Sequence, residues 1–210
     1  MELHALTGDS ASGVAPQALT EMLGDSRALQ RWKRAPRLKI LASVMRYRPG
    51  GTVEYVATPQ QLSEADLAEL ASDLTDALRA LTADTFEHFE SINKVAAPPG
   101  TVVTVSEPGF IIVGRFDGVR EAANTLGLGG RKARKDGTIT AGAIILDSEF
   151  DRTSDKRRLL RTHELGHALG YNHVRSRASI MNPHIGSEMN DFDREAALIA
   201  FRGPAVVASR

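Results

Sequence analysis

The 210-residue sequence contains no cysteine, which excludes disulfide bonds and thiolate metal ligands. It carries no net charge either, because 26 basic residues balance 26 acidic ones, so nothing suggests a nucleic acid or an anionic membrane as a partner. No apolar run approaches the roughly 20 residues of a membrane span. The hydrophobic content of 42% and charged content of 25% are typical of one globular domain.

The first residues also lack a secretory signal, since Met1–Ala5 does not show a charged segment followed by an apolar one. Either the protein is intracellular or its signal is absent from this chain. We expect the second case, a secreted or periplasmic protein, and we expect it to be a monomer.

The most informative segment is HELGHALGYNH, which begins at His163. His163 and His167 are four residues apart, so on a helix both imidazoles lie on one face and can bind one metal ion. Glu164 faces the same side further out, which suits a general base acting on a metal-bound water. Gly170 allows a helix to end sharply, because glycine adopts left-handed backbone conformations at little cost. The chain can then bring His173 back as a third ligand.

Three histidine ligands leave a fourth metal position open for water, as in catalytic zinc sites. A solvated helix face or a chance match is the alternative interpretation. A bare HExxH occurs by chance in about one per cent of chains of this length, and the longer motif is about a thousandfold rarer. We therefore predict a Zn²⁺ site with His163, His167 and His173 as ligands and Glu164 as the catalytic residue. No other cofactor is expected.

A methionine follows this motif in the segment Ser179-Ile180-Met181-Asn182-Pro183. Together, the histidine motif and Met181 resemble the metzincin family of zinc metallopeptidases. The resemblance implies that Met181 lies beneath the metal as an apolar support, with Gly170 supporting the turn. It also implies a mixed α+β fold. The expected parts are a twisted, mostly parallel sheet packed on two long helices and a C-terminal subdomain with a Met-turn and a final helix.

Within the metzincins, Pro183 resembles the Met-x-Pro pattern of matrixins. Val174 departs from every familiar branch, since matrixins carry Ser or Thr there, adamalysins Asp, astacins Glu and serralysins Pro. The chain is thus similar to matrixins without being a standard member. The segment 124–136 lacks the set of aspartates and histidines with which matrixins bind calcium and a second zinc, so we expect neither. Without cysteine, the cysteine switch of matrixin precursors is excluded.

Residues 1–48 differ from the rest and predict an N-terminal arm or a propeptide-like remnant, followed by a catalytic domain over 49–210. A weak helical pattern spans 19–32, and the basic run from Arg31 to Lys39 is interpreted as a solvated surface rather than a binding patch. In some metzincin precursors an aspartate blocks the zinc, and Asp9 or Asp25 would be the candidates here.

The pattern of the remaining chain indicates alternating strands and helices. Thr58-Pro59 or, slightly later, Ser63 with Asp66 would begin a long helix that ends near Thr82. Strands are expected at 52–57, 102–106, 110–116 and 138–146, and further helices at 157–169 and 191–201. This order fits a mixed α/β domain. The metzincin resemblance implies that residues near 125–128 form an exposed sheet edge above the cleft, where an extended peptide adds as a strand.

The motifs together predict a zinc-dependent endopeptidase in which Glu164 passes a proton from the attacking water to the leaving amine. Its partner would be a peptide or protein substrate, and residues 184–190 would line the pocket beside the cleaved bond. His184 is interpreted as a loop residue rather than a fourth ligand. Two alternatives stay open: a zinc hydrolase of a non-peptide amide, and a catalytically silent zinc-binding module.

Overall fold

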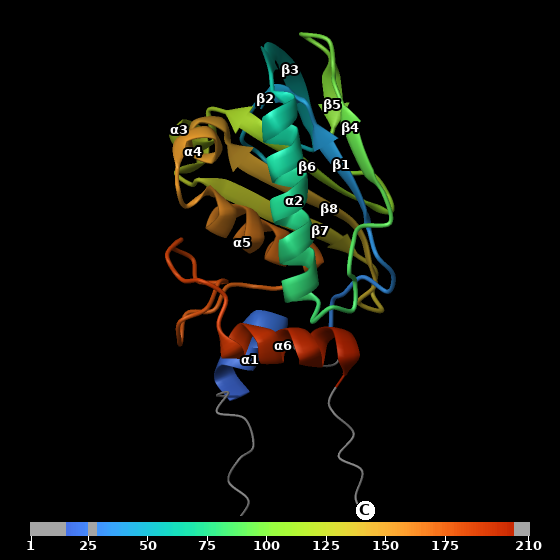
Figure 1. Ribbon diagram of the computed structural model, residues 1–210, viewed down its shortest axis with the longest axis vertical. Coiled ribbons are helices and arrows are strands. Elements are labelled where there is room, and N and C mark those ends of the chain that lie inside the picture. Colours follow the sequence, from blue (N-terminus) through green and yellow to red (C-terminus); the bar gives the residue numbers. More distant parts are fainter. Residues whose placement is uncertain (1–15, 25–28, 204–210) are drawn as a thin grey trace, which may run out of the picture.

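The computed structural model describes residues 16–24 and 29–203, which form one mixed sheet with helices packed against it (Figure 1). The strand at the centre is β6 (Phe110–Asp117), and seven of its eight residues are buried. It pairs in parallel with β8 (Ile139–Asp147) on one side. Its other side pairs in parallel with β1 (Arg37–Leu41) and then with β2 (Ser43–Arg46). Such nearly continuous apolar strands are typical of a parallel sheet covered on both faces.

Shorter strands complete the sheet at its edges. β4 (Ile92–Val95) pairs in parallel with β1, whereas β3 (Glu54–Gln61) pairs antiparallel with β2 and with β5 (Val102–Thr104). The opposite edge is β7 (Gly127–Ala133), which is antiparallel to β8. The result is the mixed, largely parallel sheet that the sequence predicts, with several helices, and it is compatible with a metzincin fold.

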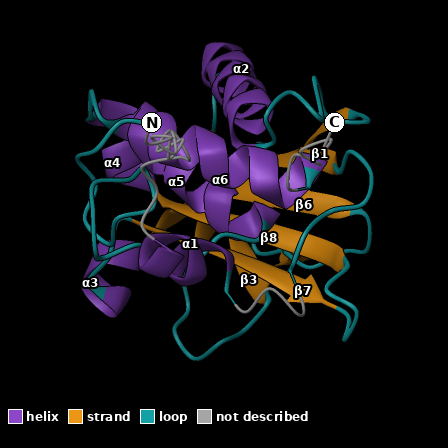
Figure 2. Cartoon of the chain, turned by 90° about the horizontal axis from the view of Figure 1, so that it is seen from below, coloured by secondary structure: helices purple, strands orange, loops and turns teal. Residues whose placement is uncertain are grey.

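Two long helices cover one face of the sheet. α2 (Glu64–Leu81) begins at Ser63, whose side chain forms a capping box with Asp66. α5 (Arg157–Leu169) packs against α2, β7 and β8. The helix α6 (Asp191–Arg202) lies next to α1 (Pro16–Leu23) below them (Figures 1 and 2). The short helices α3 (Val119–Ala123) and α4 (Ser148–Thr153) complete the set.

Apolar side chains form a core on each face of the sheet. The larger cluster lies between the sheet and the helices, and it includes the buried leucines of α2, which are Leu67, Leu70, Leu74, Leu78 and Leu81. The smaller cluster on the other face gathers around Phe116 and Tyr55, whose rings meet edge to face. Among the described residues, no helix is long and apolar enough to cross a membrane.

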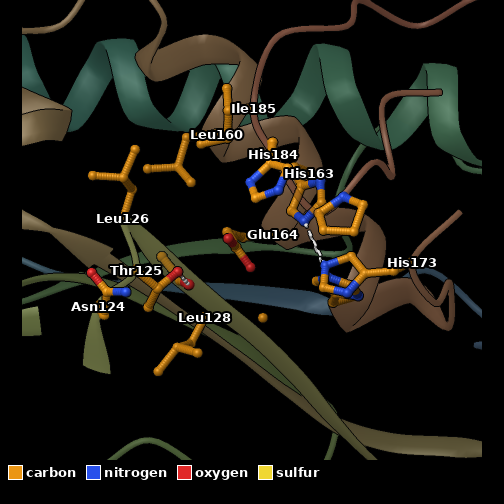
Figure 3. Close-up of a pocket in the computed structure, with 14 residues that line it drawn as sticks. Asn124, Thr125, Leu126, Leu128, Leu160, His163, Glu164, His173, His184 and Ile185 are labelled. Atoms are coloured by element: carbon orange, nitrogen blue, oxygen red, sulfur yellow. Dashed lines mark hydrogen bonds between the residues drawn. The ribbon is translucent and has the colours of Figure 1, made fainter. Parts of the chain in front are cut away.

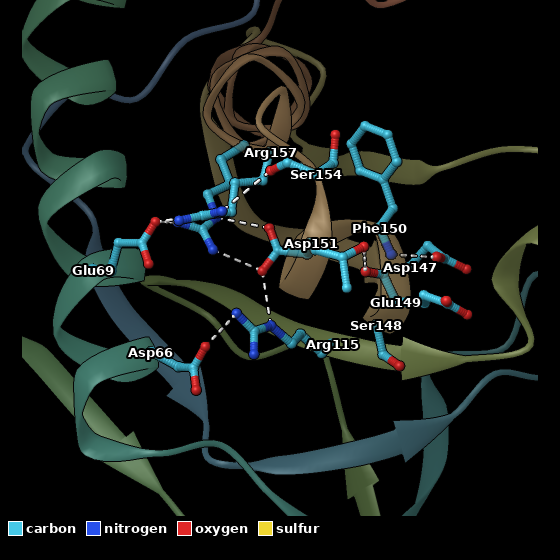
Figure 4. A network of polar contacts seen from close by, with 12 residues as sticks. Asp66, Glu69, Arg115, Asp147, Ser148, Glu149, Phe150, Asp151, Ser154 and Arg157 are labelled. Atoms are coloured by element: carbon cyan, nitrogen blue, oxygen red, sulfur yellow. Dashed lines mark hydrogen bonds and ion pairs between the residues drawn. The ribbon is translucent and has the colours of Figure 1, made fainter.

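A network of buried charges ties α5 to the sheet (Figure 4). The carboxylate of Asp151, on α4, accepts hydrogen bonds from Arg115 of β6 at 2.8 Å and from Arg161 of α5 at 2.7 and 2.8 Å. Asp151 and Arg161 are fully buried, and Arg115 is nearly so. Arg161 also donates to Asp73 of α2 at 2.7 Å, so one guanidinium joins three helices.

The sequence predicted several elements correctly and missed others. Helix 157–169 is confirmed, and so are the Ser63 start of α2 and, within a residue, the span of α6. The helix start at Thr58-Pro59 is wrong, because β3 continues to Gln61. The sheet edge expected at residues 125–128 begins and ends later than predicted, since β7 spans residues 127–133. The strands β1, β2 and β4 were not predicted.

The expected division at residue 48 falls just after β2, which ends at Arg46. β1 and β2 pair with β6 at the centre of the sheet, so residues 37–46 belong to the same sheet as the later strands. The weak helical pattern over 19–32 corresponds only to α1, which ends at Leu23. Asp9 and Asp25, the candidates to block the metal, lie outside the described residues.

Candidate metal centre and its cleft

Helix α5 presents the first two histidines, and the turn after it presents the third. His163 and His167 lie on successive turns of the helix, as their four-residue spacing predicts. The helix ends at Gly170, whose φ of +126° is strained for other residues. A Cβ at this position would also lie 2.2 Å from the Gln30 carbonyl oxygen. Glycine is therefore required both by the backbone conformation and by the close approach of the N-terminal segment.

The three imidazoles converge on one point (Figure 3). The Nε2 atom of His167 lies 3.2 Å from that of His163 and 3.1 Å from that of His173, and the remaining pair is 3.3 Å apart. Nitrogens that each bind one zinc ion at 2.0–2.1 Å in tetrahedral geometry are separated by about 3.3 Å. The donor set and its spacing therefore fit Zn²⁺.

Outer hydrogen bonds orient two of these rings. The Nδ1 atom of His163 donates to the Ile180 carbonyl at 2.7 Å, and that of His167 donates to the Tyr171 carbonyl at 2.9 Å. Each bond leaves the Nε2 lone pair directed at the shared point, as is usual for histidine ligands. Burial, reinforced by the neighbouring His163, lowers the pKa of His167 to about 4. The neutral imidazole, which is the form that binds metal, is thus favoured.

Glu164 lies in the cleft between α5 and β7, beside the histidines (Figure 3). Its exposed fraction is 4%, and burial raises the pKa of its carboxyl group to about 8, although a hydrogen bond with the Gly129 backbone opposes the shift. The contact with β7 is close, because a Cβ at Gly127 would lie 2.7 Å from Oε1 of Glu164. A carboxyl group so placed can exchange a proton within the cavity.

Met181 lies against α5 between the two helical ligands and is fully buried. A Cβ at Gly166 would lie only 2.4 Å from the Met181 sulfur, so the helix needs a glycine where it meets this side chain. The carbonyl of Met181 accepts a hydrogen bond from the Val174 backbone at 2.9 Å. Val174 itself is fully buried, which explains why an apolar residue follows the third histidine here.

A cavity of about 450 Å³ opens over the histidines. One wall is β7 with the residues that precede it, and the other wall is α5 with the segment after Met181. Leu126, Leu160 and Ile185 supply apolar lining. His184 also lines the cavity but is not among the three converging imidazoles. Among the described strands, β7 pairs with none but β8, so no strand covers its other edge. The strand begins at Gly127 and not at the predicted residue 125.

Two polar residues that the sequence did not single out hold the loop around His173. Glu21 of α1 accepts hydrogen bonds from the backbone N–H groups of Arg175 at 2.7 Å and Ser176 at 3.1 Å. These bonds lower the pKa of the Glu21 carboxyl group. On the other side, Arg131 of β7 donates to the Tyr171 carbonyl at 3.2 Å. Neither partner is near in sequence, so no local pattern could have revealed these contacts.

The spacing between β7 and α5 leads to a first prediction, which concerns Gly129. A Cβ there would lie 2.3 Å from the Glu164 carbonyl oxygen and 2.7 Å from the His167 Cβ. We expect Gly129→Ala to push the strand off the helix and to lower the free energy of unfolding by about 1–3 kcal/mol, as overpacking usually does. Urea unfolding would measure the loss.

The matched control is Gly130→Ala on the same strand, where an added Cβ meets no atom within 4 Å. If the two substitutions changed stability equally, the close packing of β7 on α5 would not be the cause.

Comparison with known proteins agrees with this geometry. A family model described as Matrixin matches residues 115–196, which run from β6 through the three histidines into α6. A search of curated proteins found no significant match. The family match supports a matrixin- or metzincin-like relationship and a hydrolase of the metalloprotease kind, without indicating a particular member.

Proposed function

We propose that the protein is a zinc-dependent endopeptidase. One observation carries the proposal: three imidazole Nε2 atoms lie 3.1–3.3 Å apart in the same cavity as the buried carboxyl group of Glu164. The Matrixin match over these residues supports the same class of reaction.

His163, His167 and His173 would hold the metal ion. A bound Zn²⁺ supplies Lewis acidity, lowering the pKa of a water ligand towards about 7 and polarising a carbonyl group. Glu164 takes a proton from the attacking water and delivers it to the leaving amine. Its carboxyl group lies in the same cavity as the three imidazoles, so it can reach both the attacking water and the leaving amine.

The cavity walls suit a peptide in extended conformation. The edge of β7 that no described strand covers can pair with the backbone of such a chain, which gives affinity without requiring particular side chains. The apolar lining from Leu126, Leu160 and Ile185 would receive an apolar side chain next to the cleaved bond. The strand edge favours a peptide substrate over a small non-peptide amide. The buried carboxyl group of Glu164 disfavours a catalytically silent zinc-binding module, because burying an acid costs free energy that such a module has no need to expend.

The decisive experiment is digestion of a denatured protein or a peptide library, with the new amino termini identified by mass spectrometry. We expect cleavage to stop when a zinc chelator removes the metal and to return when Zn²⁺ is restored, because the three histidines alone supply no nucleophile. Cleavage that persists without metal would contradict the proposal. Zinc binding without any peptide cleavage would favour one of the two alternatives.

A further inference from the structure

Arg131 differs from its basic neighbours on and after β7. Lys132, Arg134 and Lys135 are exposed, whereas the Arg131 side chain turns inward and is partly buried. Its guanidinium donates four hydrogen bonds. The acceptors are Gln30 Oε1 at 2.6 Å, the His167 carbonyl at 3.1 Å, the Tyr171 carbonyl at 3.2 Å and Asn172 Oδ1 at 2.8 Å.

These acceptors surround the turn that joins the second histidine to the third. The His167 carbonyl belongs to the last turn of α5, where it also accepts the Gly170 N–H at 3.2 Å and where a cation is favourable. The Tyr171 carbonyl also accepts the Nδ1 hydrogen of His167. Arg131 thus shares an acceptor with one histidine and bonds the residue directly before the other, which is His173.

The partners of Arg131 are unusual for a partly buried cation. Within the part of the chain that the structure describes, no carboxylate pairs with it, and all four acceptors are neutral. Arg115 and Arg161, by contrast, both pair with Asp151. A desolvated charge without a counterion has a free-energy cost, which argues that the contacts themselves are needed. The guanidinium spreads five N–H donors over a planar fork and reaches all four acceptors, whereas the compact ammonium group of lysine has only three donors.

We propose that Arg131 is a positioning residue that holds the turn between His167 and His173, and that it couples this turn to the strand edge where a peptide would bind. Its side chain starts on β7, close to Gly129 of the cavity wall, and ends on the loop of the third ligand. The coupling to a peptide rests on the proposed function, whereas the positioning of the ligands does not.

The test compares Arg131→Met with Arg134→Met, which removes an exposed arginine just beyond the same strand. We expect Arg131→Met to weaken zinc binding by about 10–100-fold, as is typical when an outer partner of the ligands is lost. Competition with a chromophoric chelator measures this without any substrate. Arg131→Lys should lie between the wild type and Arg131→Met, and Arg134→Met should match the wild type.

Kinetics and stability separate positioning from a general structural role. For peptide cleavage at saturating zinc, we expect Arg131→Met to lower kcat and raise KM, because ligand geometry and strand position are both disturbed. If zinc-free Arg131→Met were less stable than the wild type but bound zinc with the same affinity, the proposal would be overturned. If Arg131→Met did not fold, Asn172→Ala would replace it, since this change removes one loop acceptor. Unchanged zinc affinity in Asn172→Ala and Arg131→Lys would also overturn it.

The zinc-affinity measurements test the positioning role of Arg131 whether or not the protein is a peptidase. Gln30→Leu removes the one acceptor outside the turn, so its zinc affinity should stay within a few-fold of the wild type. If the wild type bound zinc but cleaved no peptide, the proposed function would fail while the zinc measurements on Arg131 would stand.

Discussion

Glu164→Gln should abolish peptide hydrolysis while zinc binding is retained. Glutamine keeps the shape of the buried side chain but cannot take a proton from water, so the step that generates the nucleophile is lost. General acid–base catalysis typically contributes about 10²–10⁴-fold, and we expect kcat/KM to fall by at least this factor. Zinc should stay bound because the three imidazole nitrogens are unchanged.

The measurements are the cleavage rate of a fluorogenic peptide and the zinc content of the same sample. Glu121→Gln, an exposed carboxylate on α3, is the matched control and should behave as the wild type. Glu164→Gln should also fold without zinc, because burial already favours the uncharged form of the Glu164 carboxyl group and the glutamine amide is uncharged. A Glu164→Gln protein that holds zinc and cleaves at the wild-type rate would refute the base assignment.

The site was predictable from sequence to the extent that its chemistry is local. His163, Glu164 and His167 are placed by one helix, and Gly170 ends that helix, so the spacing alone predicts their arrangement. Arg131 could not be assigned in this way. Its contacts with the site cross 36–41 residues of sequence, and a basic run on the surface gives no sign of which member turns inward.

In the fold too, features set by neighbouring residues were predictable and features set by distant residues were not. The start of α2 was predictable because the capping box of Ser63 lies within four residues. The strand β1 was missed, since its partners β4 and β6 lie more than 50 residues away and its basic residues were interpreted as part of a solvated surface run. Thr58-Pro59 was misleading. Proline is tolerated in β3 because the pairing with β2 is irregular between Ala57 and Gln61.

The second large effect concerns stability, and Asp151→Asn should produce it. Asp151 is the shared partner of two buried guanidiniums, at 2.7–2.8 Å from each. Removing its charge leaves Arg115 only with Asp66, and it leaves Arg161 with the acids of α2 alone. Breaking a buried ion pair from one side typically costs about 3–5 kcal/mol. We expect a loss of this size in urea unfolding of the zinc-free protein.

The matched control for this prediction is Asp191→Asn. Asp191 forms an ion pair with Arg194 at 2.8 Å, but its side chain is 100% exposed, so we expect a change within about 0.5 kcal/mol. A comparable loss in both variants would indicate a general effect of charge removal, and a loss below about 1 kcal/mol for Asp151→Asn would contradict the role of the buried network.

Because Arg161 lies two residues before His163, a weakened network should loosen the helix α5 near its start, whereas Arg131 acts at its end. Zinc added in excess should therefore recover part of the lost stability of Asp151→Asn, since a ligand that binds only the folded state shifts the equilibrium towards it.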